Sequence, residues 1–304
     1  MIDRTLTVVV DKEKCVGCGA CVSVCPSRSF AIKEGKAKLV GDKSLQCGHC
    51  EAVCPVGAIS NSGVQKEAQE FKTFEFNDKF LSEEDCNLSN LVGLMGSRRS
   101  CRNYTSDPVA KDMLEDLVRA GIMAPSGTNS QMWTFTIVPD RKSLLEVGFK
   151  VRDFFKWLNN LAESWILRNT TKVIGFGQLD EYYRKYYESI KKGIAESAEE
   201  GSDRLWHGAT SAIFVASKKG ASCPSEDALL ATQNILLAAH AMGLGTCLIG
   251  FAVAAMKRDK SIQESIGIPR DEDVFSVIAL GHTDEKYVKC AGRKLPIIRY
   301  WQRK

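Results

Sequence analysis

Apolar and polar residues are distributed differently in three successive parts of the chain. In residues 1–62 the apolar runs are short, and residues 6–10 are rich in β-branched side chains, which predicts a strand. Residues 63–90 are mostly polar and charged, apart from four phenylalanines. These are Phe71, Phe74, Phe76 and Phe80. We expect them to dock this connector onto one or both of the flanking parts.

Residues 91–304 alternate between helical and strand-like patterns. Apolar residues at Met113, Leu114, Leu117 and Val118 form one face of a predicted helix over 110–122. Further helices are predicted over 143–162, 180–200 and 226–242, and strands over 133–138, 212–217 and 274–281. The helix over 226–242 is apolar on almost every side and should be buried. These patterns predict an α+β domain.

One segment, residues 235–256, is long enough and sufficiently uncharged to be compared with a membrane span. Gly243 and Gly245 interrupt it, and His240 lies within it. We therefore predict a buried helix followed by a loop, and no membrane association. No basic patch followed by an apolar run opens the chain, so we expect no secretion signal and a cytoplasmic protein.

Composition narrows the functional classes. A length of 304 residues suggests two domains. The 41 basic and 37 acidic residues give a net charge of only +4, which offers little reason to expect nucleic-acid binding. The 12 cysteines cluster at metal-ligand spacings, which favours thiolate ligation in a reducing compartment over disulfides.

The first cysteine run has the spacing of an iron–sulfur ferredoxin. Cys15, Cys18, Cys21 and Cys25 precede Pro26 as C-x2-C-x2-C-x3-C-P. Three closely spaced cysteines wrap a loop around one cluster, while the fourth crosses to the other cluster. Zinc sites use two pairs of ligands and need neither the fourth cysteine nor the proline. The run therefore predicts a two-cluster domain over 1–62.

The second run repeats the first with one change, because Ser44 stands in the place of its first cysteine. Cys47, Cys50 and Cys54 follow at the expected spacing. The crossing rule assigns two ligand sets. The first cluster takes Cys15, Cys18, Cys21 and Cys54, and the second takes Cys25, Cys47 and Cys50 with Ser44.

The fourth ligand of the second cluster stays open. A serine alkoxide is a harder iron ligand than a thiolate. The alternatives are a [4Fe-4S] cluster with a serine or solvent ligand, a [3Fe-4S] cluster, or a distant ligand such as Cys86. We favour the [4Fe-4S] cluster with an altered fourth site, beside a regular [4Fe-4S] first cluster.

Four separated blocks in residues 91–304 resemble the nitroreductase family of flavin enzymes. The blocks are Arg98-Arg99-Ser100-Cys101-Arg102-Asn103-Tyr104 with Pro108, Ala124-Pro125-Ser126-Gly127-Thr128-Asn129-Ser130-Gln131-Met132-Trp133, the segment 236–250, and 278–282 with Arg293-Lys294. Their order is that of the family, although Met132 replaces the usual proline. The resemblance implies an α+β flavin domain over 91–304, joined by the connector 63–90 to the ferredoxin-like domain.

The resemblance also implies FMN and assigns roles to residues. Clustered cations suit a phosphate, so Arg98, Arg99, Ser100 and Arg102 would hold the FMN phosphate and ribityl chain. Arg293 and Lys294 would complete this site. The loop expected to meet the flavin ring contains Pro125, Ser126, Gly127, Asn129 and Gln131. In the family this loop comes from the partner subunit, which implies a homodimer. The opposite side of the ring would face Thr246, Cys247, Leu248, Ile249 and Gly250.

No catalytic acid, base or nucleophile is expected, because the flavin carries the redox chemistry. The leading hypothesis is an FMN oxidoreductase that receives electrons through its own clusters and reduces a nitro compound, quinone or similar small acceptor. No G-x-G-x-x-G follows a strand, yet NAD(P)H could dock directly over the flavin. One alternative is therefore an NAD(P)H-dependent flavin reductase that exports electrons through the clusters. Another is a non-catalytic carrier or redox sensor. The external donor would be a ferredoxin or NAD(P)H, and the tyrosine-rich region 180–205 would shape the acceptor pocket or form an ordinary surface helix.

Overall fold

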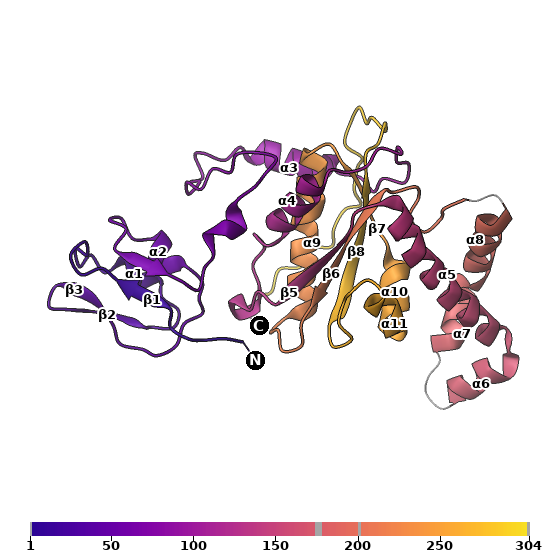
Figure 1. Ribbon diagram of the computed structural model, residues 1–304, viewed down its shortest axis with the longest axis horizontal. Coiled ribbons are helices and arrows are strands. Elements are labelled where there is room, and N and C mark those ends of the chain that lie inside the picture. The colour runs from indigo at the N-terminus through magenta and orange to yellow at the C-terminus, as the bar shows by residue number, and fades with distance from the viewer. Residues whose placement is uncertain (1, 174–177, 200–201, 303–304) are drawn as a thin grey trace.

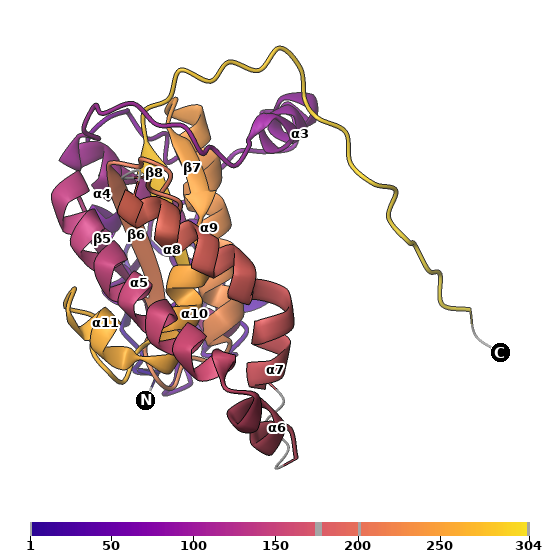
Figure 2. The ribbon, with the colours of Figure 1, turned by 90° about the vertical axis from the view of Figure 1, so that its right-hand side faces the viewer.

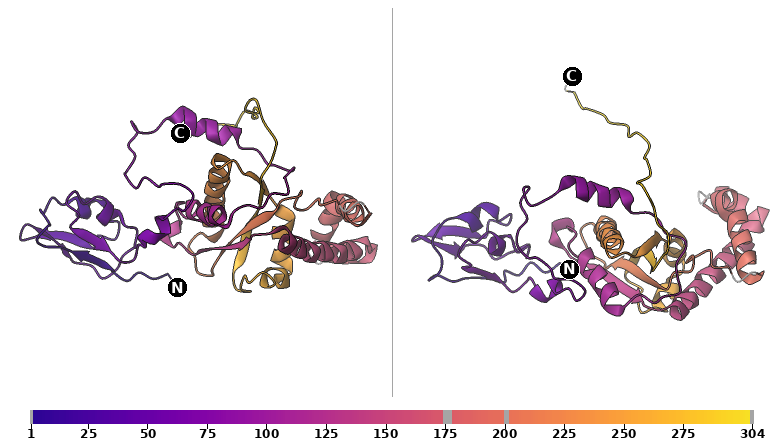
Figure 3. Two further views of the ribbon diagram at one scale, coloured as in Figure 1. Left: turned by 45° about the horizontal axis from the view of Figure 1, so that its top comes forward. Right: turned by 90° about the horizontal axis from the view of Figure 1, so that it is seen from above.

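The computed structural model describes residues 2–173, 178–199 and 202–302. The two cysteine runs lie in a small module at one end of the molecule, and helices α6, α7 and α8 lie at the opposite end (Figures 1 and 3). A four-stranded sheet between them forms the centre of the second domain. The predicted combination of a small ferredoxin-like module and an α+β domain is confirmed.

The module over residues 1–62, called here the ferredoxin module, has two similar halves. Strand β1 (Val8–Val10) pairs antiparallel with β4 (Ile59–Asn61), and β2 (Phe30–Lys33) pairs antiparallel with β3 (Lys36–Leu39). Each cysteine run ends in a short helix, α1 (Ala20–Val24) or α2 (His49–Ala52). The predicted strand over 6–10 is confirmed as β1. The module buries few apolar side chains, and its cysteines belong to that small core.

The connector is fastened to the second domain mainly by polar contacts. It contains a 3₁₀ helix, η1 (Lys66–Gln69), and the carboxylate of Asp116 on helix α4 (Lys111–Gly121) accepts the backbone N–H groups of Lys72 and Thr73. Burial alone would raise the pKa of Asp116, but the hydrogen bonds from Thr73 and Lys72 lower it below its usual value.

The connector's phenylalanines contribute less to docking than expected. The ring of Phe71 packs against those of Phe74 and Phe76, so these three side chains mainly contact one another. Phe80 is 89% exposed, and its predicted docking is not seen in the single chain. Helix α3 (Leu88–Ser97) follows, with the Asn87 side chain capping its first turn.

The sheet of the second domain is antiparallel, in the order β5-β6-β8-β7. Its strands are β5 (Trp133–Val138), β6 (Ser211–Ser217), β7 (Gly245–Leu248) and β8 (Asp273–Gly281). Helices α4 and α9 (Pro224–Ala241) cover one face, and α5 (Arg141–Glu163), α10 (Gly250–Arg258) and α11 (Lys260–Glu264) cover the other. Alternate residues of β6 point to opposite faces, Phe214 to one and Ile213 to the other, so the central strand is buried on both sides.

The predicted strands over 133–138, 212–217 and 274–281 are confirmed, as are the helices over 110–122, 143–162 and 226–242. The helix predicted over 180–200 is divided into α7 (Gln178–Tyr182), a π-helical turn η3 (Tyr183–Tyr187) and α8 (Glu188–Glu199), and residue 200 lies outside the described residues. Helix α6 (Trp165–Val173) precedes them.

The apolar segment 235–256 forms the end of α9, all of β7 and the start of α10. The prediction of a loop after the buried helix was wrong, because residues 245–248 pair with β8. Across the described parts of the chain, we find no helix with the length and apolar character needed to cross a membrane.

Candidate functional site

The four predicted ligands of the first cluster surround one small cavity in the ferredoxin module. Cys15, Cys18, Cys21 and Cys54 all line it. The backbone N–H of Ala37 donates to the Cys15 sulfur at 3.3 Å, which lowers the pKa of that thiol. Four cysteine sulfurs around one cavity, with an amide donor already aimed at one of them, fit a cubane cluster held by thiolates.

A second cavity in the module is lined by the second predicted set. Cys25, Cys47, Cys50 and Ser44 all contribute to it. The Ser44 hydroxyl oxygen accepts the backbone N–H of Gln46 at 2.9 Å. This cavity therefore offers three thiols and one hydroxyl, which fits a cluster with one unusual site.

The two halves of the module resemble each other in detail. The N–H of Ser29 donates to the Cys25 sulfur, and the N–H of Ala58 donates to the Cys54 sulfur, each four residues along the chain. Cys86, the distant alternative ligand, is exposed in the connector and does not line either cavity.

Residues 98–102, called here the arginine segment, run alongside strand β7. Ser100 and Thr246 form a parallel bridge, and the N–H of Cys101 donates to the carbonyl of Thr246 at 2.8 Å. Cys101 is buried, whereas Ser100 and Arg102 are exposed. The sequence allows this close pairing because Gly245 has no side chain, and a Cβ there would lie 2.8 Å from the Cys101 sulfur.

Three arginines of this segment do not act as one cluster. Arg98 and Arg102 both lie within electrostatic range of the Cys247 thiol, where they oppose the rise in its pKa that burial causes. Arg99 instead lies near Tyr287. A hydrogen bond with Glu285 raises the pKa of that tyrosine, and the positive charge of Arg99 opposes the rise. An extended backbone explains the difference, because alternate side chains point to opposite sides. Arg98, Ser100 and Arg102 therefore form the better predicted phosphate cradle.

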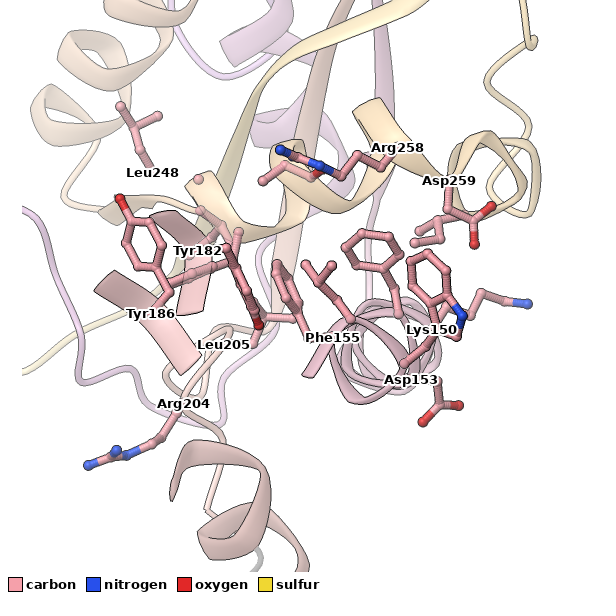
Figure 4. Close-up of a pocket in the computed structure, with 18 of the residues that line it drawn as sticks. Lys150, Asp153, Phe155, Tyr182, Tyr186, Arg204, Leu205, Leu248, Arg258 and Asp259 are labelled. Carbon is pink, nitrogen blue, oxygen red and sulfur yellow. The ribbon is translucent and has the colours of Figure 1, made fainter. Parts of the chain in front are cut away.

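A cavity of about 1700 Å³ opens beside the arginine segment. Of the predicted cofactor-binding residues, it is lined by Arg102, Cys247, Leu248, Ile249 and Gly250. Figure 4 shows Leu248 on one side of it and the side chains of helix α5, including Phe155, on another. The cavity is large enough for a cofactor-sized ligand and a small second molecule.

Aromatic rings form much of the wall of this cavity. Phe155 and Tyr186 each meet Phe251 edge-to-face, and Tyr182 stacks on Phe155 (Figure 4). Burial raises the pKa of Tyr182 to about 12. The tyrosine-rich region 180–205, which contains Tyr182 and Tyr186, was the sequence signal for this wall. No pattern in the sequence had indicated Phe155 or Phe251.

His207 is a further cavity residue that the sequence did not single out as functional. Its backbone adopts a left-handed conformation with φ of 56°. Burial lowers the pKa of its imidazole, and the nearby positive charge of Arg102 lowers it further. The ring therefore favours the neutral form at neutral pH beside the predicted phosphate cradle.

The loop of residues 125–131 is held by a buried carboxylate at the start of helix α9. Asp227, 2% exposed, accepts the N–H of Gly127 at 2.7 Å and the hydroxyl of Ser130 at 3.1 Å. A Cβ on Gly127 would lie 2.8 Å from the Cys223 sulfur, so a larger residue there would displace the Cys223 side chain. Sequence reasoning missed Asp227, which is 100 residues from the loop that it holds.

The 125–131 loop has an unusual backbone. Thr128, Asn129 and Gln131 all have φ between 46° and 53°, in the left-handed region. This region is uncommon for residues other than glycine, and it is a genuine outlier for a β-branched threonine. Such conformations persist only where the surroundings hold them, and they concentrate at functional sites.

The same loop also contacts the ferredoxin module. The Asn129 side-chain amide donates to the carbonyls of Leu45 and Gln46 at 2.9 and 3.1 Å. The Arg4 guanidinium donates to the carbonyl and hydroxyl of Thr128, each at 2.8 Å. Asn129, predicted to face the flavin ring, is thus engaged with the loop that precedes Cys47.

Within one chain, the 125–131 loop and the arginine segment are far apart. The loop is held at the first turn of α9 by Asp227, whereas Ser97, next to the arginine segment, hydrogen-bonds His240 in the last turn of α9. Asp227 and His240 are 13 residues apart, which corresponds to about 20 Å along the helix. One chain alone does not bring these two predicted parts of a flavin site together.

The remaining predicted phosphate ligands lie on an extended C-terminal arm. The arm begins after strand β8 and runs away from the domain (Figure 2). Both Arg293 and Lys294 are exposed, and Arg293 donates to the carbonyls of Ala291 and Gly292 in its own arm. Neither residue lines the large cavity of the single chain.

Comparison with known proteins agrees with both halves of the chain. Residues 95–282 match the nitroreductase family, and residues 14–58 match a 4Fe-4S dicluster domain. A protein of Archaeoglobus fulgidus, named as an NADH dehydrogenase/NAD(P)H nitroreductase, is 27% identical over 204 residues, covering 66% of this chain and 89% of that protein. An NADH dehydrogenase of Thermus thermophilus is 22% identical over 192 residues, covering 62% and 84%. A nitroreductase structure from Bacteroides fragilis with bound FMN has a TM-score of 0.50 at 21% identity, covers 70% of this chain and 98% of its own, and shows a shared fold.

Proposed function

The chain belongs to the nitroreductase family, and we propose that it is an FMN-dependent oxidoreductase fed with electrons by its own two iron–sulfur clusters. The observation that carries this proposal is the contact between Asn129 and the carbonyls of Leu45 and Gln46. It joins the loop expected to meet the flavin to the edge of the second cluster site. A one-electron carrier and a two-electron flavin are thus connected within one protein.

The residues of the large cavity and of the adjoining arginine segment fit FMN. Arg98 and Arg102 would bind the phosphate, with the Ser100 hydroxyl as a further partner, because charge-assisted hydrogen bonds suit a phosphate dianion. Residues 246–250 would lie along the cofactor, and Gly250 begins helix α10 beside it. FMN, when bound, supplies the storage of two electrons that single-electron clusters lack. The protein contributes orientation and a largely apolar wall.

The aromatic wall favours a planar acceptor. Phe155, Tyr182, Tyr186 and Phe251 offer ring faces and edges, and stacking on such rings contributes beyond simple burial of area. A nitroarene or a quinone has the flat, electron-poor ring that suits this wall. The Tyr182 hydroxyl donates to Asn159 at 2.6 Å, which fixes the orientation of its ring.

The complete site is proposed to form in a homodimer. The length of helix α9 separates the arginine segment from the 125–131 loop in one chain, so a second copy would have to supply one of them. Exposed apolar residues support such an interface. They include Leu88, Leu91, Val92 and Met95 on α3 and Leu295, Ile297, Ile298 and Trp301 on the arm. Large exposed apolar side chains grouped on one segment are typical of interaction sites.

Anaerobic titration with a reduced low-potential ferredoxin tests the proposal. The flavin absorbance should bleach in step with the added electrons once the clusters are reduced. A Cys47→Ala/Cys50→Ala variant, which removes two ligands of the second cluster, should lose most of this bleaching while retaining FMN. Equal bleaching in both proteins would show that the clusters do not feed the flavin.

A second candidate deserves the same experiment because two relatives carry NADH dehydrogenase in their names. In that case NADH or NADPH would reduce FMN directly, and the clusters would export the electrons. Fast bleaching by NADH in the wild type and in the cluster variant, with slow bleaching by ferredoxin, would favour this direction.

A further inference from the structure

The second cluster site is the part of the ferredoxin module that touches the second domain. Leu45 and Gln46, whose carbonyls accept the Asn129 amide, stand between Ser44 and Cys47. Both Ser44 and Cys47 line the second cavity. The hydrogen bonds therefore attach the 125–131 loop to two residues, each of which is next in sequence to a predicted ligand of this cluster.

Arg4 makes the same connection from another direction. Its guanidinium donates to the carbonyl and the hydroxyl of Thr128, while its own carbonyl accepts the N–H of Ser44 at 2.9 Å. Arg4 thus forms hydrogen bonds both with the 125–131 loop and with Ser44, the residue that replaces a cysteine ligand. On the module side Gln46 has φ of 52°, so left-handed residues face each other across this contact.

The first cluster site has no comparable attachment. Among the described residues, those that line its cavity make hydrogen bonds only inside residues 1–62. This asymmetry indicates the order in which electrons would pass through the two clusters. Electrons that enter at the first cluster would leave the module through the second.

The exit does not lead to the cavity of the same chain. The ferredoxin module and helix α7, which lines the large cavity together with α5, lie at opposite ends of the molecule (Figure 1). The 13 residues of α9 between Asp227 and His240, about 20 Å along the helix, separate the 125–131 loop from the arginine segment. A flavin bound at Arg98 and Arg102 is therefore remote from the clusters of its own chain.

We propose that the second cluster delivers electrons across the 125–131 loop to the FMN held by the arginine segment of the partner subunit. This inference rests on the proposed function. Each transfer oxidises a cluster by one electron, and a reduced ferredoxin supplies the replacement. Two transfers, with protons taken from solvent, reduce one FMN. Asn129 and Arg4 act as positioning residues that keep the exit cluster against the loop.

Mixed dimers separate transfer between subunits from transfer within one subunit. Two tagged chains are co-expressed and purified through both tags. One carries Arg98→Ala/Arg102→Ala, which removes its own phosphate cradle, and the other carries Cys47→Ala/Cys50→Ala, which removes its second cluster. A second mixed dimer pairs the wild-type chain with a chain that carries all four substitutions. Each of these two dimers should bind one FMN, which is checked by flavin content, and each should show one intact second cluster in its spectrum.

In the dimer with one defect on each chain, the intact clusters and the intact cradle are on different subunits. Transfer between subunits predicts bleaching by reduced ferredoxin at the wild-type rate per bound flavin. In the dimer of wild type with a chain carrying all four substitutions, the only intact cradle faces a defective cluster. Bleaching there should fall at least tenfold. Transfer within a subunit predicts the opposite result for each dimer and would overturn the inference.

If the double cysteine variant does not fold, Arg4→Glu replaces it, because a carboxylate facing the Thr128 carbonyl should undock the exit cluster. The same charge reversal at exposed Arg28 is the matched control. A monomeric protein that transfers electrons would also overturn the inference. If wild-type clusters never bleach the flavin, the proposed function itself fails, so the two failures are distinguishable.

Discussion

Replacing Asp227 by asparagine should loosen the 125–131 loop and weaken FMN binding while both clusters remain in place. Asp227 is almost fully buried, and its two oxygens accept hydrogen bonds from Gly127 and Ser130. Asparagine has the same shape, but one of its polar atoms is a donor. The asparagine oxygen would still accept the Gly127 N–H, and the Ser130 hydroxyl would turn to accept from the new amide, so both hydrogen bonds persist without a charged acceptor.

The size of the effect follows from these contacts. A hydrogen bond to a charged group contributes about 1.5–3 kcal/mol. A carboxylate in the first turn of a helix adds about 0.3–1 kcal/mol through the helix dipole. Loss of the charge from both hydrogen bonds and from the helix terminus should therefore cost about 2–4 kcal/mol locally. If ordering the loosened loop around the flavin requires about 1.4 kcal/mol of this energy during binding, FMN should bind roughly tenfold more weakly.

The neighbouring Glu226 provides the matched control. It is exposed, lies in the same first turn of α9, and its carboxylate accepts a hydrogen bond from Ser225 rather than from the 125–131 loop. Glu226→Gln therefore removes the helix charge alone and should change FMN affinity by less than about threefold.

FMN affinity is measured by quenching of flavin fluorescence, and loop order by amide hydrogen exchange in a peptide that covers residues 125–131. Cluster spectra should be unchanged in both variants. The reasoning would be refuted if Asp227→Asn and Glu226→Gln gave the same affinity and the same exchange.

Three further predictions concern other parts of the chain. Arg98→Ala and Arg102→Ala should each weaken FMN binding roughly 10- to 100-fold, since each removes a charge-assisted bond, whereas Arg99→Ala should have little effect in the same titration. Ser44→Cys should give the second cluster a fourth thiolate, so a [3Fe-4S] spin signal obtained by mild oxidation of the wild type should disappear; its persistence would exclude residue 44 as a ligand. Asp116→Asn should weaken connector docking by about 2 kcal/mol, because the Lys72 and Thr73 amides lose a charged acceptor. Limited proteolysis should then cut residues 63–90 faster, and an unchanged cleavage rate would contradict this role.

Local patterns in the sequence predicted much of the architecture. The stripe at Leu114 and Leu117 and the β-branched runs of the central sheet carry their own periodicity, so the elements could be located without tertiary information. The two cysteine runs and the four blocks of the second domain predicted the iron–sulfur domain and the nitroreductase family, and both are confirmed. Strand β7 was missed because Gly243 and Gly245 indicated a loop and its four residues are too few to show an alternating pattern.

The contacts that organise the candidate site could not be predicted in this way. Asp227 accepts a hydrogen bond from Gly127, 100 residues earlier, and Asp116 accepts one from Lys72, 44 residues earlier. Nothing in the sequence around either aspartate indicates its partner. The side chain of Asn129 contacts the ferredoxin module, a pairing set by how the two domains pack. Arg293 and Lys294 remain predictions for a dimer, because the arm that carries them extends away from its own chain.

The most direct test of the account is the order of reduction in the protein with both clusters and FMN bound. The protein is mixed anaerobically with reduced ferredoxin and frozen at successive times, and cluster spin signals are compared with flavin absorbance. The account predicts that the cluster signals rise first and then decay as the flavin bleaches, and that this bleaching is lost in Cys47→Ala/Cys50→Ala. Flavin bleaching that precedes cluster reduction, or that proceeds at the same rate without the second cluster, would contradict the claim that the clusters feed the flavin.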